Sequence, residues 1–323
     1  MRVATVLIAI ALSLSRGVSA SPTPGGVPGK ATAPQPDLAK ARPVHIPVRE
    51  NGIIGSLVVP DATRAYPGIL RIGGAEGGIS IGDAETIASQ GYAVLALAYF
   101  GMETLPSDLE EVPLEYFGKA IAWMKKSPNI NSSKLAVIGI SRGSTAALLL
   151  PTICDEFDAV VALAPSHVTW QSSYLDWDRY AEKSSHTWRG KPVPWVPYDF
   201  SDKAAMVGCD ETAACSKMYE HSLKQEQRAR DALIPVEKIR APILLLSGKA
   251  DSMWPSTAMA DLIMRRLREG NFPYDYRHVA YENAGHCGLN RCYDHVHPAG
   301  DQVAVEDMRR QLFQFLDQHL RQK

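Results

Sequence analysis

Short, almost wholly apolar runs alternate with amphipathic segments from residue 45 to residue 320, and this alternation constrains the fold more than any other feature. Runs such as Tyr92–Ala98 and Ala159–Ala164 are apolar at every position, so both faces of each strand must be covered. Strands of this kind, separated by helices, are typical of parallel sheets with helices on each side. The sequence therefore predicts the α/β class, with a mostly parallel, doubly wound sheet.

Hydrophobic periodicity and turn residues place the predicted elements along the chain. Pro47 interrupts the first strand, which therefore belongs at a sheet edge, and Asn51-Gly52 is a strong hairpin signal. The predicted strands are His45–Val48, Ile53–Val59, Gly68–Ile72, Tyr92–Ala98, Leu135–Ile140, Ala159–Ala164, Pro242–Leu246 and Tyr274–Ala280. The predicted helices are 83–90, Leu109–Lys126, Ser144–Leu150, Ala258–Arg268 and Val305–Leu320.

A glycine-flanked serine lies between a predicted buried strand and a predicted helix. The motif GISRG at 139–143 follows the run Leu135–Ile140. In that context G-x-S-x-G forms a nucleophile elbow, a tight turn in which a Cβ at either glycine would collide with neighbouring backbone. The turn lifts the Ser141 hydroxyl above the sheet and directs the N–H of Arg142 towards a developing oxyanion. Ser141 is therefore the predicted nucleophile.

A serine hydroxyl needs a neighbouring base at neutral pH, and in this motif class the acid and the histidine follow the serine in the chain. Asp251 follows the predicted strand at 242–246, and His286 follows the predicted strand at 274–280. We predict that His286 takes the Ser141 proton and that Asp251 fixes the imidazole tautomer. The alternatives are Glu282 and Asp294 as the acid, with His278 (inside a strand), His295 and His297 as further imidazoles.

A second backbone donor for the oxyanion is expected from the loop after the strand Gly68–Ile72. The run GGAEGG at 73–78 lets the backbone approach a substrate carbonyl closely. We predict the N–H of Ala75 as the donor, with Gly74 and Glu76 as alternatives. The run lacks G-x-G-x-x-G and the Lys-Ser/Thr of a P-loop, so nucleotide binding is not expected. The predicted catalytic residues require neither a cofactor nor a metal.

The stretch from about 166 to 235 breaks the alternation of strands and helices. A long aromatic-rich insertion in such a protein is often a cap over the active site, because pockets lie at the carboxyl ends of the strands. The alternative is a packed surface excursion with its own small core. Eight aromatic residues lie between positions 170 and 200: Trp170, Tyr174, Trp177, Tyr180, Trp188, Trp195, Tyr198 and Phe200.

The first residues have the pattern of a secretory signal. Met1-Arg2 is followed by the apolar run Val3–Leu14 and by the small residues Val18-Ser19-Ala20, which predict a signal peptide at 1–20 with cleavage after Ala20. The apolar run is short of the roughly 20 residues that a membrane span needs. Residues 21–43 are rich in proline and glycine and predict a linker before an α/β domain at 44–323. The expected location is the periplasm or the exterior.

The charge of the chain bears on its binding partners, and its cysteines bear on disulfides and metal sites. Lys plus Arg is 34 and Asp plus Glu is 35, without a basic run, so a nucleic-acid partner is not expected. Cys209 and Cys215 lie close in sequence, as do Cys287 and Cys292, and two local disulfides are plausible in an oxidising compartment, leaving Cys154 free. The four cysteines allow three pairings. The rival hypothesis, whose spacing fits no zinc pattern, is a metal site at Cys287, Cys292, Asp294, His295 and His297.

Several longer blocks resemble one family. The blocks are GILRIGGAEGG (68–78), GYAVLALAYFGMETLP (91–106), LEYFGKAIAWM (114–124), GISRGS (139–144) and ALIPVEKIRAPILLLSGKADSMWPS (232–256). They are similar to the catalytic domain shared by acyl-CoA thioesterases and bile-acid-CoA:amino-acid N-acyltransferases, within the dienelactone-hydrolase-like α/β hydrolases. The resemblance implies an α/β-hydrolase fold whose nucleophile, acid and base correspond to Ser141, Asp251 and His286. Ser144 replaces the family's usual second glycine.

Three functional hypotheses follow. The first is a serine ester or thioester hydrolase acting on a small-molecule acyl substrate; Ser141 favours it, since family members that transfer acyl groups to amino acids use cysteine there. The second is an acyltransferase using the same acyl-enzyme. The third is a non-catalytic binding protein on a hydrolase scaffold, which the order of Ser141, Asp251 and His286 argues against. A secretory signal leads to a compartment where coenzyme A is not expected, which favours an ester or another thioester.

Overall fold

The computed structural model describes residues 42–173, 181–207, 209, 214–294 and 297–321. The predicted signal peptide, nearly all of the predicted linker and the aromatic residues Tyr174, Trp177 and Tyr180 lie outside these residues. Within the part of the chain that the structure describes, no helix combines the length and the apolar character needed to cross a membrane.

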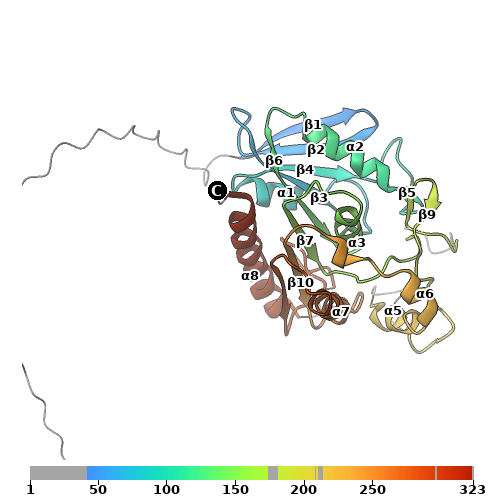
Figure 1. Cartoon of the computed structure of the whole chain (residues 1–323). Helices are drawn as coiled ribbons and strands as arrows, with labels where there is room; N and C mark the ends of the chain where they lie inside the picture. The colour runs from blue at the N-terminus through green and yellow to red at the C-terminus, as the bar shows by residue number, and fades with distance from the viewer. Residues whose placement is uncertain (1–41, 174–180, 208, 210–213, 295–296, 322–323) are drawn as a thin grey trace, which may run out of the picture. The chain divides into compact units, whose positions relative to one another are not determined.

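An eight-stranded sheet forms the centre of the domain (Figure 1). β2 runs antiparallel to β1 and to β4, and every other neighbouring pair is parallel. The prediction that the Pro47 strand lies at an edge is confirmed. In spatial order the strands are β1 (Val44–Glu50), β2 (Ile53–Val59), β4 (Ala93–Ala98), β3 (Tyr66–Ile72), β6 (Ile130–Ile140), β7 (Ala159–Leu163), β10 (Ile243–Gly248) and β11 (Tyr276–Tyr281).

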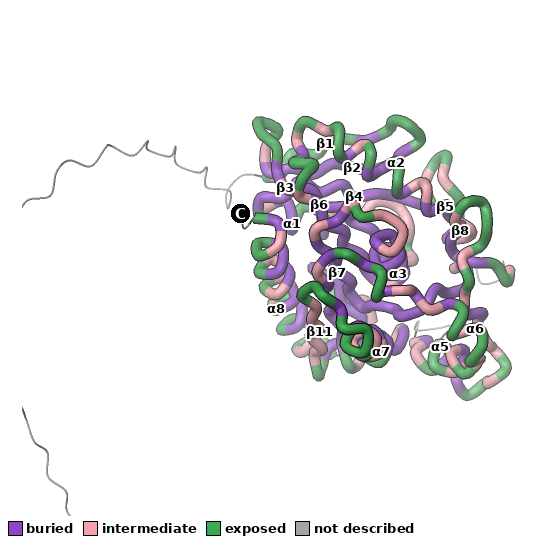
Figure 2. Tube along the Cα trace, in the orientation of Figure 1, coloured by how far each residue is buried: buried purple, intermediate pink, exposed green. Residues whose placement is uncertain are grey.

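Helices cover both faces of the sheet, as the alternation predicts. α1 (Ile81–Ala88) and α8 (Pro298–Leu316) pack on one face. α2 (Leu114–Met124), α3 (Arg142–Leu149) and α7 (Ser256–Glu269) pack on the other. Alternate residues of each central strand join opposite clusters, and Figure 2 shows these strands buried between helices with exposed outer surfaces. The fold is a doubly wound α/β sheet.

Three helices, α1, α3 and α7, begin two residues before the predicted start, and two others differ by more. The predicted helix Leu109–Lys126 begins only at Leu114, because Val112–Pro113 is extended and pairs as β5 with a strand some 70 residues later. The closing helix begins earlier than Val305, at Pro298, and proline is tolerated in the first turn of a helix because its missing N–H has no partner there.

The insertion after β7 forms small elements of its own. Two of them, β8 (His186–Trp188) and β9 (Lys191–Pro192), join β5, which lies before α2 in the chain, in a three-stranded sheet. α5 (Ser216–Ser222) and α6 (Glu226–Asp231) follow, drawn in gold in Figure 1. Short 3-10 turns lie at η1 (Leu150–Thr152) and η2 (Val236–Lys238), and a last helical turn, η3 (Asp317–Arg321), ends the described chain. An apolar cluster joins the insertion to the main domain through Val168, Trp170, Val196, Ala232, Trp254 and Met259.

The fully buried Leu245 of β10 tests the importance of the central sheet. We expect Leu245→Ala to lower the free energy of unfolding by about 2–5 kcal/mol, because the removed atoms leave a cavity between tightly packed layers. Denaturant unfolding measures the change. The matched control is Val303→Ala at a position 67% exposed on α8, where the change is expected to stay within about 0.5 kcal/mol. Equal losses in both variants would contradict this description of the core.

Candidate active site

The Ser141 turn between β6 and α3 has a strained backbone. Ser141 has φ 53° and ψ −124°, a conformation that side chains rarely adopt. A Cβ on Gly139 would lie 2.1 Å from the Gly143 carbonyl oxygen, and one on Gly143 would lie 2.0 Å from the Gly73 carbonyl oxygen. Both glycines are therefore required by the close backbone approach, and the turn has the geometry predicted for a nucleophile elbow.

Hydrogen bonds hold the strained turn against the sheet. The Ser141 N–H donates to the Leu163 carbonyl at the end of β7, at 3.0 Å. The Ser144 hydroxyl donates to the Ser141 carbonyl at 2.6 Å. Ser144, the expected departure from a second glycine, is fully buried and gives this carbonyl an additional partner.

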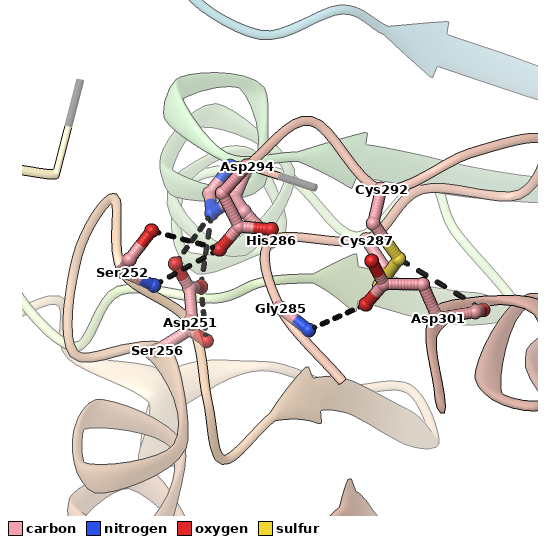
Figure 3. The surroundings of a disulfide bond; sticks show 9 residues. All are labelled: Asp251, Ser252, Ser256, Gly285, His286, Cys287, Cys292, Asp294 and Asp301. Carbon is pink, nitrogen blue, oxygen red and sulfur yellow. Dashed lines mark hydrogen bonds and ion pairs between the residues drawn. A yellow bond between two sulfur atoms is a disulfide. The ribbon is translucent and has the colours of Figure 1, made fainter. Parts of the chain in front are cut away.

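His286 and Asp251 form a buried, hydrogen-bonded pair (Figure 3). Asp251 lies in the loop after β10, and His286 lies in the loop after β11. The Nδ1 atom of His286 is 2.9 Å from Oδ2 of Asp251, and the two side chains are 3% and 2% exposed. Asp251 also accepts hydrogen bonds from the N–H groups of Met253 and Trp254 and from the Ser256 hydroxyl at 2.6 Å. These donors fix the carboxylate so that it orients the imidazole.

The other imidazole nitrogen, Nε2 of His286, is buried and has no hydrogen-bond partner among the described residues. Ser141 and His286 line the same cavity of about 150 Å³, although no hydrogen bond joins them in this structure. In enzymes without substrate such contacts are often long and tighten when substrate binds. Because Nδ1 is bonded to Asp251, Nε2 is the imidazole nitrogen that remains free to exchange a proton.

The charges around His286 favour its protonated form. Burial alone would lower the pKa of the imidazole, but the charge and hydrogen bond of Asp251, with the charges of Asp294 and Glu76, raise this pKa above its ordinary value. The Asp294 carboxylate does not bond the imidazole; it accepts from the N–H and the hydroxyl of Ser252 at 3.0 and 3.1 Å. Asp294, weighed as an alternative acid, thus ties the loop of His286 to the loop of Asp251.

A disulfide closes the segment directly after His286 (Figure 3). Cys287 and Cys292 are bonded, and the Tyr293 N–H donates to the His286 carbonyl at 2.9 Å. On the other side of His286, the Gly285 N–H donates to the carboxylate of Asp301, in α8, at 2.9 Å. The backbone of His286 is therefore held from both directions.

The same disulfide bears on the metal hypothesis. The sulfur atoms of Cys287 and Cys292 are bonded to each other, so neither offers a thiolate to a metal. His295 lies outside the described residues. The second disulfide joins Cys209 to Cys215, and Cys154 is free but only partly buried.

The glycine-rich loop after β3 reaches the cavity at Ala75. The N–H of Gly74 donates to Oε1 of Glu76 at 3.1 Å, so this donor already has a partner. The Tyr99 hydroxyl donates to the carbonyls of Gly73 and Gly74 at 3.0 and 3.2 Å and fixes the turn. Ala75 lines the cavity beside Ser141, as expected for the predicted donor. Tyr99 was not singled out from the sequence, because nothing local to it indicates a contact with residues 73–74.

Arg142 contributes the other predicted N–H. It is the first residue of α3 and lines the cavity. The first N–H groups of a helix have no partner within the helix, so this one is available to a ligand. The α3 N-terminus also carries a partial positive charge, which favours a developing oxyanion.

Residues from the insertion form much of the cavity wall. Those lining the cavity are Gln171, Ser172, Ser173, Tyr198, Phe200, Cys215 and Tyr219. Met253 and Trp254, from the loop that carries Asp251, complete the wall. The insertion thus lies at the cavity that Ser141 and His286 share, the position in which a cap was expected.

A second hydroxyl, imidazole and carboxylate also lie in line. Oγ of Ser247 is 2.8 Å from Nε2 of His278, and Nδ1 of His278 is 3.1 Å from Asp261. Ser247 is buried and the group does not line the cavity that holds Ser141; burial lowers the pKa of His278. Glu282, the other alternative acid, pairs with Lys249 at the surface. The Ser247 group fits a structural role between β10, β11 and α7.

Replacing Asp294 tests the electrostatics of His286. We expect Asp294→Asn to lower the pKa of His286, because the variant removes a negative charge that favours the imidazolium while its amide oxygen can still accept from Ser252. NMR titration of histidine-labelled protein measures this pKa. The control is Glu282→Gln, which removes an exposed carboxylate paired with Lys249 and should leave the pKa unchanged. An unchanged or higher pKa in Asp294→Asn would contradict the assignment.

Comparison with solved structures identifies the fold. A solved structure from Klebsiella pneumoniae that is named a putative dienelactone hydrolase is 15% identical, with a TM-score of 0.53 over 85% of this chain and 98% of that chain. The chain has the α/β-hydrolase fold.

Comparison with known sequences identifies the family. Mouse acyl-coenzyme A thioesterase 6 is 30% identical over 250 residues, covering 75% of this chain and 54% of the relative. Mouse bile acid-CoA:amino acid N-acyltransferase is 26% identical over 244 residues, covering 75% of this chain and 53% of the relative. The chain thus spans about half the length of the curated relatives that it matches. The family described as BAAT / Acyl-CoA thioester hydrolase C terminal matches residues 112–299, more than half of the chain. The chain belongs to this family of acyl-CoA thioester hydrolase and N-acyltransferase C-terminal domains.

Proposed function

We propose that the protein hydrolyses carboxylic esters or thioesters through an acyl-serine intermediate, with Ser141, His286 and Asp251 as catalytic triad. The observation that carries the proposal is the pairing of His286 with Asp251, which leaves Nε2 free at the cavity that the strained Ser141 turn also lines. Family membership supports the same activity, because acyl-CoA thioesterases are among the relatives.

The first half of the proposed reaction acylates Ser141. Nε2 of His286 takes the hydroxyl proton while Oγ forms a bond to the substrate carbonyl carbon. The carbonyl oxygen then carries the negative charge, which the N–H groups of Ala75 and Arg142 stabilise; losing one such donor costs on the order of 3 kcal/mol. The bond to the leaving group breaks, and the His286 imidazolium protonates the departing alkoxide or thiolate. Asp251 stabilises the imidazolium throughout.

The second half returns the enzyme to its starting state. His286, neutral again, takes a proton from water as the water oxygen attacks the acyl carbon. The new tetrahedral intermediate collapses, Oγ of Ser141 leaves with the proton held by His286, and the carboxylic acid is released. An amine or alcohol in place of water would make the same steps an acyl transfer.

We place the protein outside the cytoplasm, in the periplasm or secreted. Residues 1–20 have the composition of a secretory signal, and two disulfides support the proposal because disulfides persist in oxidising compartments. Coenzyme A is not expected outside the cytoplasmic membrane, so in this location the acyl donor would be an ester or a different thioester.

Expression of the full chain in a bacterial host tests the location. We expect the mature protein in the periplasmic or culture fraction, with its amino terminus at Ser21 when measured by amino-terminal sequencing. Recovery of the uncleaved chain from the cytoplasm alone would contradict the proposal.

Replacement of the nucleophile tests the chemistry. We expect Ser141→Ala to lower kcat for a 4-nitrophenyl ester by a factor on the order of 10⁵, because no acyl-enzyme can form. A fluorophosphonate probe should label Ser141 in the wild type, as located by mass spectrometry, and should not label the variant. The control is Ser133→Ala, on the exposed start of the same strand, where turnover and labelling should persist.

Two outcomes decide against parts of this proposal. Turnover that survives in Ser141→Ala would remove Ser141 as the nucleophile. Acyl products formed on added amines in preference to the free acid would assign the protein to acyl transfer rather than hydrolysis.

A further inference from the structure

The side chain of Arg142 is a buried cation without an acidic partner. Arg142 is 4% exposed, and its Nη2 donates to the Gln171 carbonyl and to the Ser185 hydroxyl. Its Nη1 is buried with no hydrogen-bond partner, and no ion pair joins the guanidinium to a carboxylate of the described residues. Burying a charge without a counter-charge is costly, so this arrangement calls for an anion.

The acceptors around the guanidinium of Arg142 leave one of its nitrogens, Nη1, without a partner. The Gln171 carbonyl lies within hydrogen-bond distance of Arg142 Nη2, of the Ser185 hydroxyl at 3.0 Å and of the Tyr198 hydroxyl at 3.3 Å. The Ser185 hydroxyl has a nearer acceptor in the Trp170 carbonyl at 2.8 Å, so Arg142 Nη2 and the Tyr198 hydroxyl account for the two lone pairs of the Gln171 carbonyl. Nη1 has no acceptor among the described residues, and a ligand that brings an acceptor oxygen would give it a partner.

The same residues line the cavity that Ser141 and His286 share. Arg142, Gln171 and Tyr198 all belong to its wall. The nearest catalytic carboxylate, Asp251, is already bonded to His286 and three further donors. Arg142 thus belongs to the cavity wall, and its guanidinium forms no ion pair with a carboxylate of the described residues.

We propose that Arg142 binds a carboxylate at the far end of the acyl group, so that the preferred substrates are monoesters or monothioesters of short dicarboxylic acids. The proposal rests on the proposed hydrolase function and names its substrate class. A guanidinium presents parallel N–H donors that match the geometry of a carboxylate. The backbone N–H of Arg142 is the predicted oxyanion donor, so the carboxylate and the reacting carbonyl are separated by no more than one arginine side chain. The cavity of about 150 Å³ favours the same short acyl chains.

Chain-matched thioesters of N-acetylcysteamine test the preference. Glutaryl and valeryl thioesters differ only in the terminal carboxylate, and adipoyl and hexanoyl thioesters form a second pair. We expect the wild type to have a kcat/KM roughly tenfold or more higher for the carboxylate member of a pair, as a charge-assisted hydrogen bond provides. Arg142→Met should abolish this ratio, and Arg142→Lys, which keeps the charge without the fork, should retain part of it.

Two controls separate recognition of the acyl carboxylate by Arg142 from other causes of a preference. Arg240→Met removes an exposed arginine paired with Asp155 and should leave the ratio at its wild-type value. Acetyl thioesters with a carboxylate on the leaving group should show no Arg142-dependent gain; if they do, the anion belongs to the leaving group and the proposal is wrong. A wild type without preference in either pair, or a ratio unchanged in Arg142→Met, would also overturn it.

Binding provides a readout that needs no turnover. In Ser141→Ala, calorimetry should show that monomethyl glutarate binds more tightly than methyl valerate, and adding Arg142→Met should remove the difference. Equal binding of the two esters to Ser141→Ala contradicts the proposal whatever the kinetics show. Tighter binding of the carboxylate together with an absence of turnover in the wild type would instead refute the hydrolase function and leave the anion site standing.

Discussion

The hydrogen-bonded pair of Asp251 and His286 determines how the rest of the site is arranged. The pair is sealed from solvent, and a buried carboxylate is stable only when its oxygens have partners. Two backbone N–H groups and the Ser256 hydroxyl supply them, and Ser256 is the first residue of α7. The orientation of the imidazole is therefore linked to the packing of a helix that covers the central sheet.

Several contacts connect the loops around this pair to one another and to α8. Asp294 connects the loop after β11 to the loop after β10, and Asp301 connects the first of these to α8. The Cys287–Cys292 disulfide closes the short segment that directly follows His286. Together these contacts fix the backbone around the His286 imidazole, whose residue lines the cavity.

The sequence is informative where structure depends on local pattern. The apolar runs predicted the parallel sheet, Pro47 predicted the edge strand, and the glycines beside Ser141 predicted the strained turn. Each of these features depends on the residues of one short stretch. The predicted start of α2 was wrong because Val112–Pro113 pairs with β8, a partner some 70 residues away that periodicity cannot indicate.

The same limit applies to the site. The chain order of Ser141, Asp251 and His286 can be read from motifs, and the structure brings the last two into contact. The roles of Tyr99 and Asp294 depend on which loops meet in space, and no short motif carries that information. The unpartnered guanidinium of Arg142 is likewise visible only once the insertion is folded against α3.

The division of the cavity between two parts of the chain has an evolutionary consequence. The proposed reacting groups come from loops of the central sheet, whereas Gln171, Tyr198, Phe200 and Tyr219 of the wall come from the insertion. Substitutions in the insertion can therefore change the shape of the cavity that would bind an acyl chain without altering the groups proposed to transfer the proton. Trp254 restricts this freedom, because it packs in the cluster beneath the insertion and lies three residues from Asp251. Divergence of selectivity should be concentrated away from that tryptophan.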